Sequence, residues 1–147
     1  MMAALYLKKG AVINLQVKDK FELQAIHKAL MEAKFHPSPE QPIVQSSPMV
    51  ANFMHKVVNE LEKINWVTEA EKKFRGIEYK NDWAEWRRNP PESIVLPCVV
   101  CNLSEIEELE NTSEQEFFEF MEVLLSPYKV TKDKISEIVT AAKTKKI

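Results

Sequence analysis

Residues 93–103 have the sequence SIVLPCVVCNL, and the fold class assigned to the chain depends on how this segment is interpreted. Its first eight residues are an almost continuous apolar run rich in β-branched side chains, which is typical of a strand covered on both faces. Pro97 removes a backbone hydrogen-bond donor inside the run, so the strand is expected at a sheet edge or at a bulge. We therefore predict a strand over residues 93–100.

A second source of strands lies near the N-terminus, where residues 4–17 have the sequence ALYLKKGAVINLQV. Two short apolar runs flank a turn at Lys8-Lys9-Gly10. From residue 11 to residue 17 every second side chain is apolar, which is the period of a half-buried strand. We therefore predict an N-terminal hairpin, and a small sheet of two or three strands in the whole chain.

Helix signals dominate the rest of the sequence. Asp19 and Glu22 have the spacing of a capping box, so a helix is predicted over about 20–34. The apolar stripe of this helix, which is expected to face the core, consists of Phe21, Ala25, Ile26, Ala29, Leu30 and Ala33. Ser47-Pro48 resembles an N-cap followed by proline at the first helical position. The helix that starts there is predicted to continue through Phe74 to a stop at Gly76.

Further helices are predicted after residue 80. A short one follows a cap at Asn81 or Asp82 and ends at the proline pair, and S-x-x-E boxes at Ser104–Glu107 and Ser113–Glu116 each mark a helix start. The buried face of the second of these helices is predicted to contain Phe117, Phe118, Met121, Leu124 and Leu125. The last helix, over about 131–143, is predicted to bury Ile135, Ile138, Val139 and Ala142. The predicted fold class is α+β, with about five helices packed on the small sheet.

Length and composition limit the function classes. The 147 residues are most simply one globular domain, 1–147, with a proline-rich internal loop at 35–48. The chain has two glycines, Gly10 and Gly76, whereas a P-loop or a dinucleotide-binding loop needs several clustered glycines. The net charge of −2 is too small to predict a nucleic-acid or membrane partner. No cofactor is expected from these features.

The cellular location is predicted from patterns that the sequence lacks. The N-terminal residues have no signal-peptide pattern, and no run of about 18 apolar residues is present, as a membrane span would need. We therefore predict no membrane association and a cytoplasmic location, where reducing conditions disfavour a structural disulfide.

Cys98 and Cys101 are the two cysteines of the chain and have a C-x-x-C spacing. In a strand, residues three apart point to opposite faces with Cα atoms about 10 Å apart, whereas a disulfide requires roughly 4.4–6.8 Å. A zinc site would need two further ligands, and His36, which precedes a proline in the loop, is the most accessible histidine. Structural thiols are the favoured interpretation, and a metal or redox site at Cys98, Cys101 and His36 is the alternative.

The segment WAEWRR, residues 83–88, is the strongest candidate for partner binding. On a helix, Trp83, Trp86 and Arg87 share one face, because they lie at positions i, i+3 and i+4. Tryptophan and arginine are enriched at binding hot spots. The predicted partner-binding residues are Trp83, Trp86, Arg87 and Arg88. The alternative is that the tryptophans complete the core and the arginines are solvated.

Charge is distributed unevenly along the chain. Residues 103–125 contain eight glutamates and no lysine or arginine, which indicates a solvated helix face or a docking surface for a basic partner. Residues 72–88 interleave six basic side chains with aromatic ones, a pattern that suits single-stranded nucleic acid. Acidic residues at 71, 78, 82 and 85 interrupt that segment and weaken its field.

The sequence therefore favours a non-catalytic protein–protein interaction protein, such as an adaptor, regulator or assembly factor. Its partner is another protein or a second copy of this chain. The first alternative is a metal-dependent or thiol enzyme centred on the C-x-x-C. The second is single-stranded nucleic-acid binding through residues 72–88. An enzymatic role is left open, but the non-catalytic one is preferred.

Overall fold

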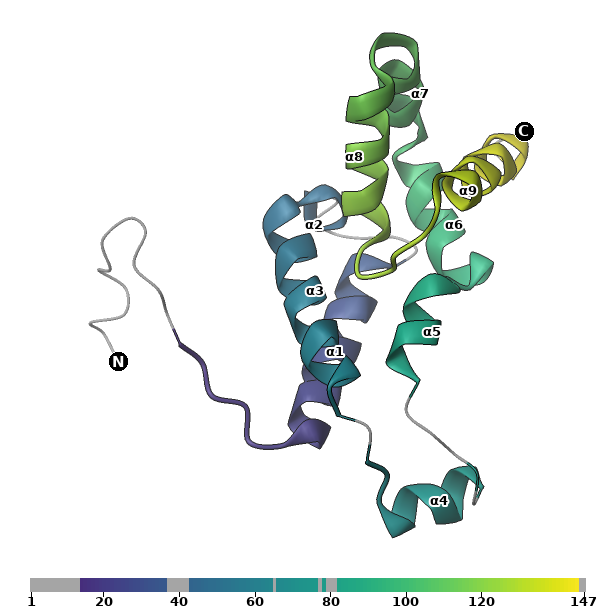
Figure 1. The fold of residues 1–147 in the computed structure, drawn as a ribbon. Coiled ribbons are helices and arrows are strands. Elements are labelled where there is room, and N and C mark those ends of the chain that lie inside the picture. The colour runs from purple at the N-terminus through teal and green to yellow at the C-terminus, as the bar shows by residue number, and fades with distance from the viewer. Residues whose placement is uncertain (1–13, 37–42, 65, 77, 79–81, 146–147) are drawn as a thin grey trace.

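The computed structural model describes residues 14–36, 43–64, 66–76, 78 and 82–145, and this part of the chain contains helices and no strand. The α+β prediction is therefore wrong, and the described fold is all-helical (Figure 1). In chain order the helices are α1 (Lys20–Lys34), α2 (Ile43–Ser46), α3 (Pro48–Glu62), α4 (Glu69–Arg75), α5 (Trp83–Arg88), α6 (Glu92–Cys101), α7 (Leu103–Thr112), α8 (Glu114–Leu125) and α9 (Lys132–Lys145).

The predicted strand over 93–100 is helix α6. A short, continuously apolar run fits a buried strand and a buried helix equally well. Val95, Leu96, Cys98 and Val99 are all buried against other helices, with α9 as the main neighbour. Because no described strand is available to pair with, the segment satisfies its backbone hydrogen bonds within a helix and tolerates Pro97 inside it.

The predicted N-terminal hairpin falls largely on residues 1–13, which lie outside the described residues. The end of its second strand is described, and residues 14–17 form no strand there. Leu15 and Val17 are 78% and 41% exposed, so the alternating pattern does not bury these side chains. In the proline-rich loop predicted at 35–48, residues 43–46 form α2 and residues 37–42 lie outside the described part.

Most helix starts were predicted correctly, because they depend on local capping. Asp19 caps α1, Ser47 caps α3, Asp82 caps α5 and Ser113 caps α8, each by accepting a backbone hydrogen bond from the residue three positions later. Ser104 is different, because α7 begins at Leu103 and places this serine in its first turn. The last helix buries the four predicted side chains.

The long helix predicted to reach Gly76 is wrong in its middle. It is interrupted after Glu62 and resumes at α4, where Thr68 and Glu71 form a reciprocal capping box. Such a box starts a new helix and reorients the chain. Gly76 ends α4 as predicted and has a φ of 100°, a conformation that favours glycine.

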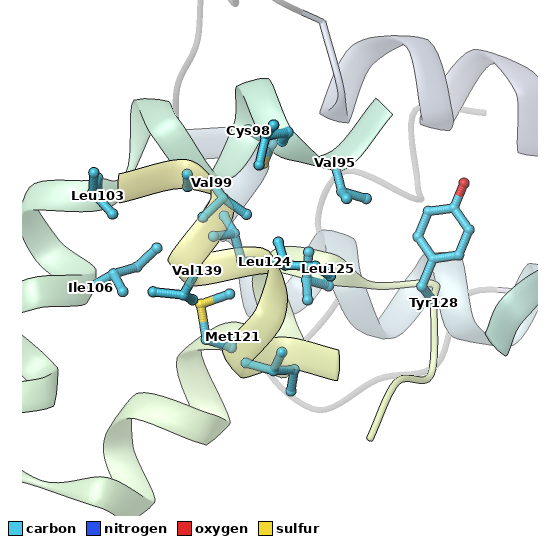
Figure 2. Packing of buried hydrophobic residues seen from close by; sticks show 14 of the residues in the cluster. Val95, Cys98, Val99, Leu103, Ile106, Met121, Leu124, Leu125, Tyr128 and Val139 are labelled. Carbon is cyan, nitrogen blue, oxygen red and sulfur yellow. The ribbon is translucent and has the colours of Figure 1, made fainter. Parts of the chain in front are cut away.

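Two hydrophobic clusters hold the described helices together. The larger one gathers side chains of α6, α7, α8 and α9 (Figure 2). The smaller one lies between α1 and α3 and is built on Leu23, Val57 and Leu61. Figure 1 shows α1 and α3 on one side of the molecule and α6–α9 on the other, with α5 leading from one group to the other.

Helix α1 does not bury the stripe that the sequence predicts. Ile26 and Leu30 are half-buried, but Phe21 is 48% exposed and Ala25, Ala29 and Ala33 are exposed. The buried residues of α1 are Lys20, Leu23, His27 and Lys34. Three of these four side chains are polar. Their packing and hydrogen bonds to other elements, not the apolar periodicity, determine which face of α1 is buried.

Candidate functional site

A groove of about 840 Å³ runs along α1 on the side that faces α5. From Gln24 to Phe35 its wall follows α1 for about 16 Å, at 1.5 Å per residue. Its lining consists of Gln24, His27, Lys28, Met31, Glu32, Phe35 and His36 from α1 and its end, Glu71 and Arg75 from α4, Trp83 and Trp86 from α5, and Pro91, Ile94 and Tyr128.

The floor of the groove is a continuous array of aromatic rings. The imidazole of His27 packs edge-on against Trp83 and Trp86, with centroid distances of 5.0 and 4.9 Å. The two indoles lie 5.6 Å apart, and Trp86 continues to Tyr128 at 4.6 Å. Both tryptophans are half-buried, so each supports the helices with one part of its ring system and lines the groove with another.

The aromatic floor is uncharged near neutral pH. Burial lowers the pKa of His27 to about 4, so its imidazole carries no charge at pH 7. Burial raises the pKa of Tyr128 to about 12, which keeps its hydroxyl protonated. The floor therefore offers apolar area with a few polar handles, as binding sites for apolar anchors do.

The rim carries charges of both signs. Lys28 and Glu32 lie on α1, and Glu71 and Arg75 lie on α4. Glu71 is held by the buried Lys20, whose Nζ lies 2.8 Å from its carboxylate and also donates to the Trp66 carbonyl oxygen at 2.8 Å. The hydrogen bond from Lys20 lowers the pKa of Glu71. These contacts fix α4, which has no buried residue, against the start of α1.

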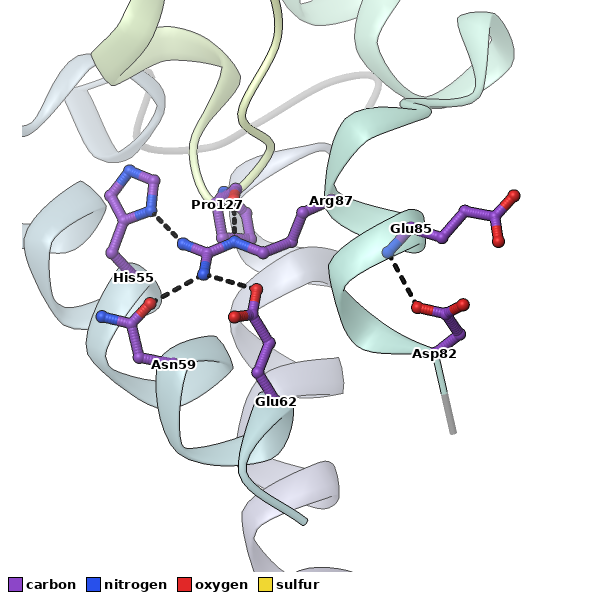
Figure 3. Close-up of polar contacts among 7 residues, drawn as sticks. All are labelled: His55, Asn59, Glu62, Asp82, Glu85, Arg87 and Pro127. Atoms are coloured by element: carbon purple, nitrogen blue, oxygen red, sulfur yellow. Dashed lines mark hydrogen bonds and ion pairs between the residues drawn. The ribbon is translucent and has the colours of Figure 1, made fainter. Parts of the chain in front are cut away.

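Arg87 is 1% exposed and points toward α3 and Pro127 (Figure 3), and it does not line the groove. Its guanidinium donates to the Pro127 carbonyl oxygen at 3.0 Å, to Asn59 at 2.7 Å, to Glu62 at 2.9 Å and to His55 Nδ1 at 2.7 Å. Burial and the neighbouring Arg87 lower the pKa of His55 to about 4, so its imidazole is neutral. Arg87 therefore joins α5 to α3 and to the turn after α8.

The four residues predicted to bind a partner are thus separated by the structure. Trp83 and Trp86 line the groove, Arg87 is buried on the other side of α5, and Arg88 is exposed and outside the lining. The i, i+3, i+4 spacing placed Arg87 on the tryptophan face, but α5 has only six residues and Arg87 turns toward α3. The other floor residues, His27 and Tyr128, come from distant parts of the chain, and no local pattern connects them.

The C-x-x-C lies on α6 with both cysteines free. Cys98 is buried and Cys101 is exposed, so the two thiols have different surroundings. Burial raises the pKa of Cys98 to about 12, which keeps the thiol protonated and a poor nucleophile. His36 is exposed at the end of the groove. Among the described residues, no three histidine, cysteine or carboxylate side chains are grouped as a metal site would need.

Lys34 is a buried basic side chain that no local sequence pattern predicts. Its Nζ donates to the carbonyl oxygens of Val123 at 2.6 Å and Ser126 at 2.8 Å, and to the Ser126 hydroxyl. These acceptors lie at the C-terminal end of α8, where a positive charge is favourable. Burial lowers the pKa of Lys34 to about 7. Like Arg87, Lys34 holds the turn after α8 and takes no part in the groove.

In the described part of the chain, none of the helices is both long and apolar enough to cross a membrane. Comparison of the sequence with protein-family models and with curated proteins, and of the chain with solved structures, gave no match.

Proposed function

We propose that this protein is a non-catalytic protein-binding module that captures a peptide segment of a partner in the groove between α1 and α5. The observation that supports this most directly is the placement of Trp83 and Trp86, which are half-buried and line the groove together. Large aromatic side chains held rigid before binding lose little entropy on binding and provide much contact area.

The dimensions and chemistry of the groove fit such a ligand. A length of about 16 Å accommodates about five residues of extended chain or three turns of a helix. The uncharged floor suits one or two apolar anchor side chains, and the mixed rim suits the polar groups that flank them.

The two alternative functions have weaker support. A thiol enzyme would need a thiolate, but the pKa of Cys98 is raised to about 12. Nucleic-acid binding by residues 72–88 has fewer accessible cations than the sequence suggests, because Arg87 is buried and Lys72 lies 3.6 Å from Glu69, although Lys73, Arg75 and Arg88 are exposed. A cytoplasmic location is part of the proposal, supported by two unbridged cysteines of which one is exposed.

A peptide-display selection tests the proposal. Peptides selected on the wild-type protein are measured by calorimetry against Trp83→Ala and Ile94→Lys. Ile94 is 38% exposed and lines the groove, so lysine there blocks the site without emptying the core. We expect both variants to weaken binding at least tenfold, whereas Ser93→Lys and Arg88→Ala, on exposed residues outside the groove, keep the wild-type affinity.

The Ile94→Lys variant separates binding from folding. Its thermal unfolding should match that of Ser93→Lys, because both side chains project from the first turn of α6 without entering the core. If selected peptides bind Ile94→Lys and Ser93→Lys equally well, or if no peptide that depends on the groove can be selected, the proposed function is wrong.

A further inference from the structure

The outer face of the α1–α3 pair carries an apolar patch near the end of α1 and the start of α3, and the described residues do not cover it. It contains Met49 and Phe53 of α3, which are 85% and 43% exposed, whereas the exposed Phe21 of α1 packs edge-on against Trp66 and points to another side. Ala25, Ala29 and Ala33 lie beside Met49 and Phe53 on α1 and are also exposed. Exposed charged side chains, Glu22 of α1 and Lys56 and Glu60 of α3, border this patch. This face is separate from the groove, which lies on the side of α1 that faces α5.

Helical periodicity places these residues on one side of the pair. Leu23 and Leu30 of α1 face Val57 and Leu61 of α3 across the smaller cluster. On α3, Met49, Phe53 and Val57 follow one another at four-residue steps and so lie along one line on the helix surface. The buried Met54 faces inward on the other side of this line. On α1, Ala29 and Ala33 lie beyond Leu30 on the side away from the buried His27 and Lys34.

The large side chains of α3 and the small side chains of α1 lie at corresponding positions along the helix axes. Helices α1 and α3 each have 15 residues and run antiparallel, and α2 contacts both where α1 ends and α3 begins (Figure 1). To within about a turn, Phe53 therefore lies level with Ala29, and Met49 lies level with Ala33. On this face the large side chains Phe53 and Met49 of α3 form a ridge, and the small side chains Ala29 and Ala33 of α1 leave a depression beside it.

We propose that this face binds the same face of a second copy of the chain, forming a four-helix dimer. A two-fold axis parallel to the helices would place α3 of each copy over α1 of the other. Phe53 and Met49 would then fill the space over Ala29 and Ala33, twice by symmetry. Such self-complementarity is the requirement for a closed, isologous dimer, and antiparallel neighbours are the usual packing in four-helix bundles.

The size of the face is sufficient. Two helices of 15 residues are about 22 Å long and together about 20 Å wide, which gives a flat footprint of about 400 Å² per copy. Accessible surface on a ridged helix pair exceeds the flat footprint, so the two faces together bury on the order of 1,000 Å². That value is at the threshold for a specific, moderately tight interface.

Sedimentation equilibrium of the full chain at about 1 to 100 µM tests the dimer. We expect the wild type to dimerise in this range, and Phe53→Lys and Ala29→Glu to raise the dissociation constant at least tenfold. Ser93→Lys is the control, since Ser93 is exposed and lies on α6, away from this face. A wild type that is monomeric at 100 µM, or a Phe53→Lys variant that dimerises as well as Ser93→Lys, would overturn the proposal.

Disulfide trapping tests the orientation with less disturbance of the surface. In a Cys101→Ser background, a protein with Ala33→Cys is mixed with one carrying Met49→Cys. The mixed pair should form disulfide-linked dimers faster than either protein alone. Equal rates would contradict the proposed stacking. None of these outcomes depends on peptide binding in the groove, so failure of this inference is distinguishable from failure of the proposed function.

Discussion

Two buried cations, Lys34 and Arg87, hold the turn that follows α8. Lys34 donates to carbonyl oxygens of Val123 and Ser126, and Arg87 donates to that of Pro127. The carbonyl oxygen of Arg87 in turn accepts from the Lys129 backbone nitrogen at 2.8 Å. Buried charges are tolerated when their hydrogen bonds are satisfied, and removal of one partner leaves the others without compensation.

Arg87→Ala should destabilise the fold strongly. The change leaves Glu62, Asn59 and the Pro127 carbonyl oxygen without their donor. Glu62 is 32% exposed and can recover some hydration, so we expect a loss of about 3 kcal/mol in the free energy of unfolding. Urea denaturation measures it. Arg88→Ala, on the exposed neighbour, should change stability by less than about 0.5 kcal/mol, and equal losses would contradict the role of Arg87.

Lys34 should make stability rise with pH just above neutrality. The pKa of Lys34 is about 7 in the folded state, against 10.5 for an unperturbed lysine. Between these values the unfolded chain binds the proton and the folded chain does not, so raising the pH favours folding. The contribution of Lys34 to this slope should approach about 1.4 kcal/mol per pH unit by pH 8.5.

The pH range 7 to 8.5 lies mostly below the titration of two groups whose pKa shifts change stability in the opposite direction. Cys98 and Tyr128 have raised pKa values of about 12, so the unfolded chain releases their protons first and they oppose the rise in stability from about pH 8.5 upward. Denaturant unfolding at pH 7.0, 7.5, 8.0 and 8.5 tests the slope. His27 and His55, whose pKa values are lowered to about 4, add a rise of the same sign that largely fades by about pH 7.5. Lys34→Met should therefore remove most of the slope between pH 7.5 and pH 8.5, and an unchanged slope in this variant would assign it to another group.

The secondary-structure elements whose ends depend on local capping were predicted correctly, whereas those that depend on tertiary packing were not. The caps at Asp19, Ser47 and Ser113 were predictable because a side chain and a backbone nitrogen three residues away form them alone. Helix α6 was not predictable, because a continuous apolar run has no periodicity that distinguishes a strand from a helix. The buried face of α1 was missed because Lys34 and His27 find partners far along the chain.

The two S-x-x-E boxes give a matched test of capping. Ser113 accepts from the Glu116 backbone nitrogen at 3.2 Å, whereas Ser104 lies inside the first turn of α7 and has no capping bond. Ser113→Ala should therefore cost about 1 kcal/mol of unfolding free energy, and Ser104→Ala should change it by no more than a few tenths. Thermal unfolding of both variants measures this, and similar effects would argue against the assigned start of α7.

At the scale of the whole molecule, the candidate site was predicted only in part. Trp83 and Trp86 were selected from a short segment because residue type and helical spacing are local signals. His27 completes the same floor from a position at least 56 residues before these tryptophans, and Tyr128 from a position at least 42 residues after them. No single-sequence pattern reports contacts over such separations, so the groove emerges only from the fold.

The hydrogen bonds from Lys34 and Arg87 to the turn after α8 affect how cooperatively the chain unfolds. Helices α1 and α3 share one hydrophobic cluster and α6–α9 another, and these two side chains join the first group to the end of α8. Wild-type unfolding should accordingly be a single cooperative transition. In a double variant, Arg87→Ala with Lys34→Met, both links are lost and the coupling should weaken, so that calorimetry detects two overlapping transitions and the α1–α3 amides exchange with solvent before those of α6–α9.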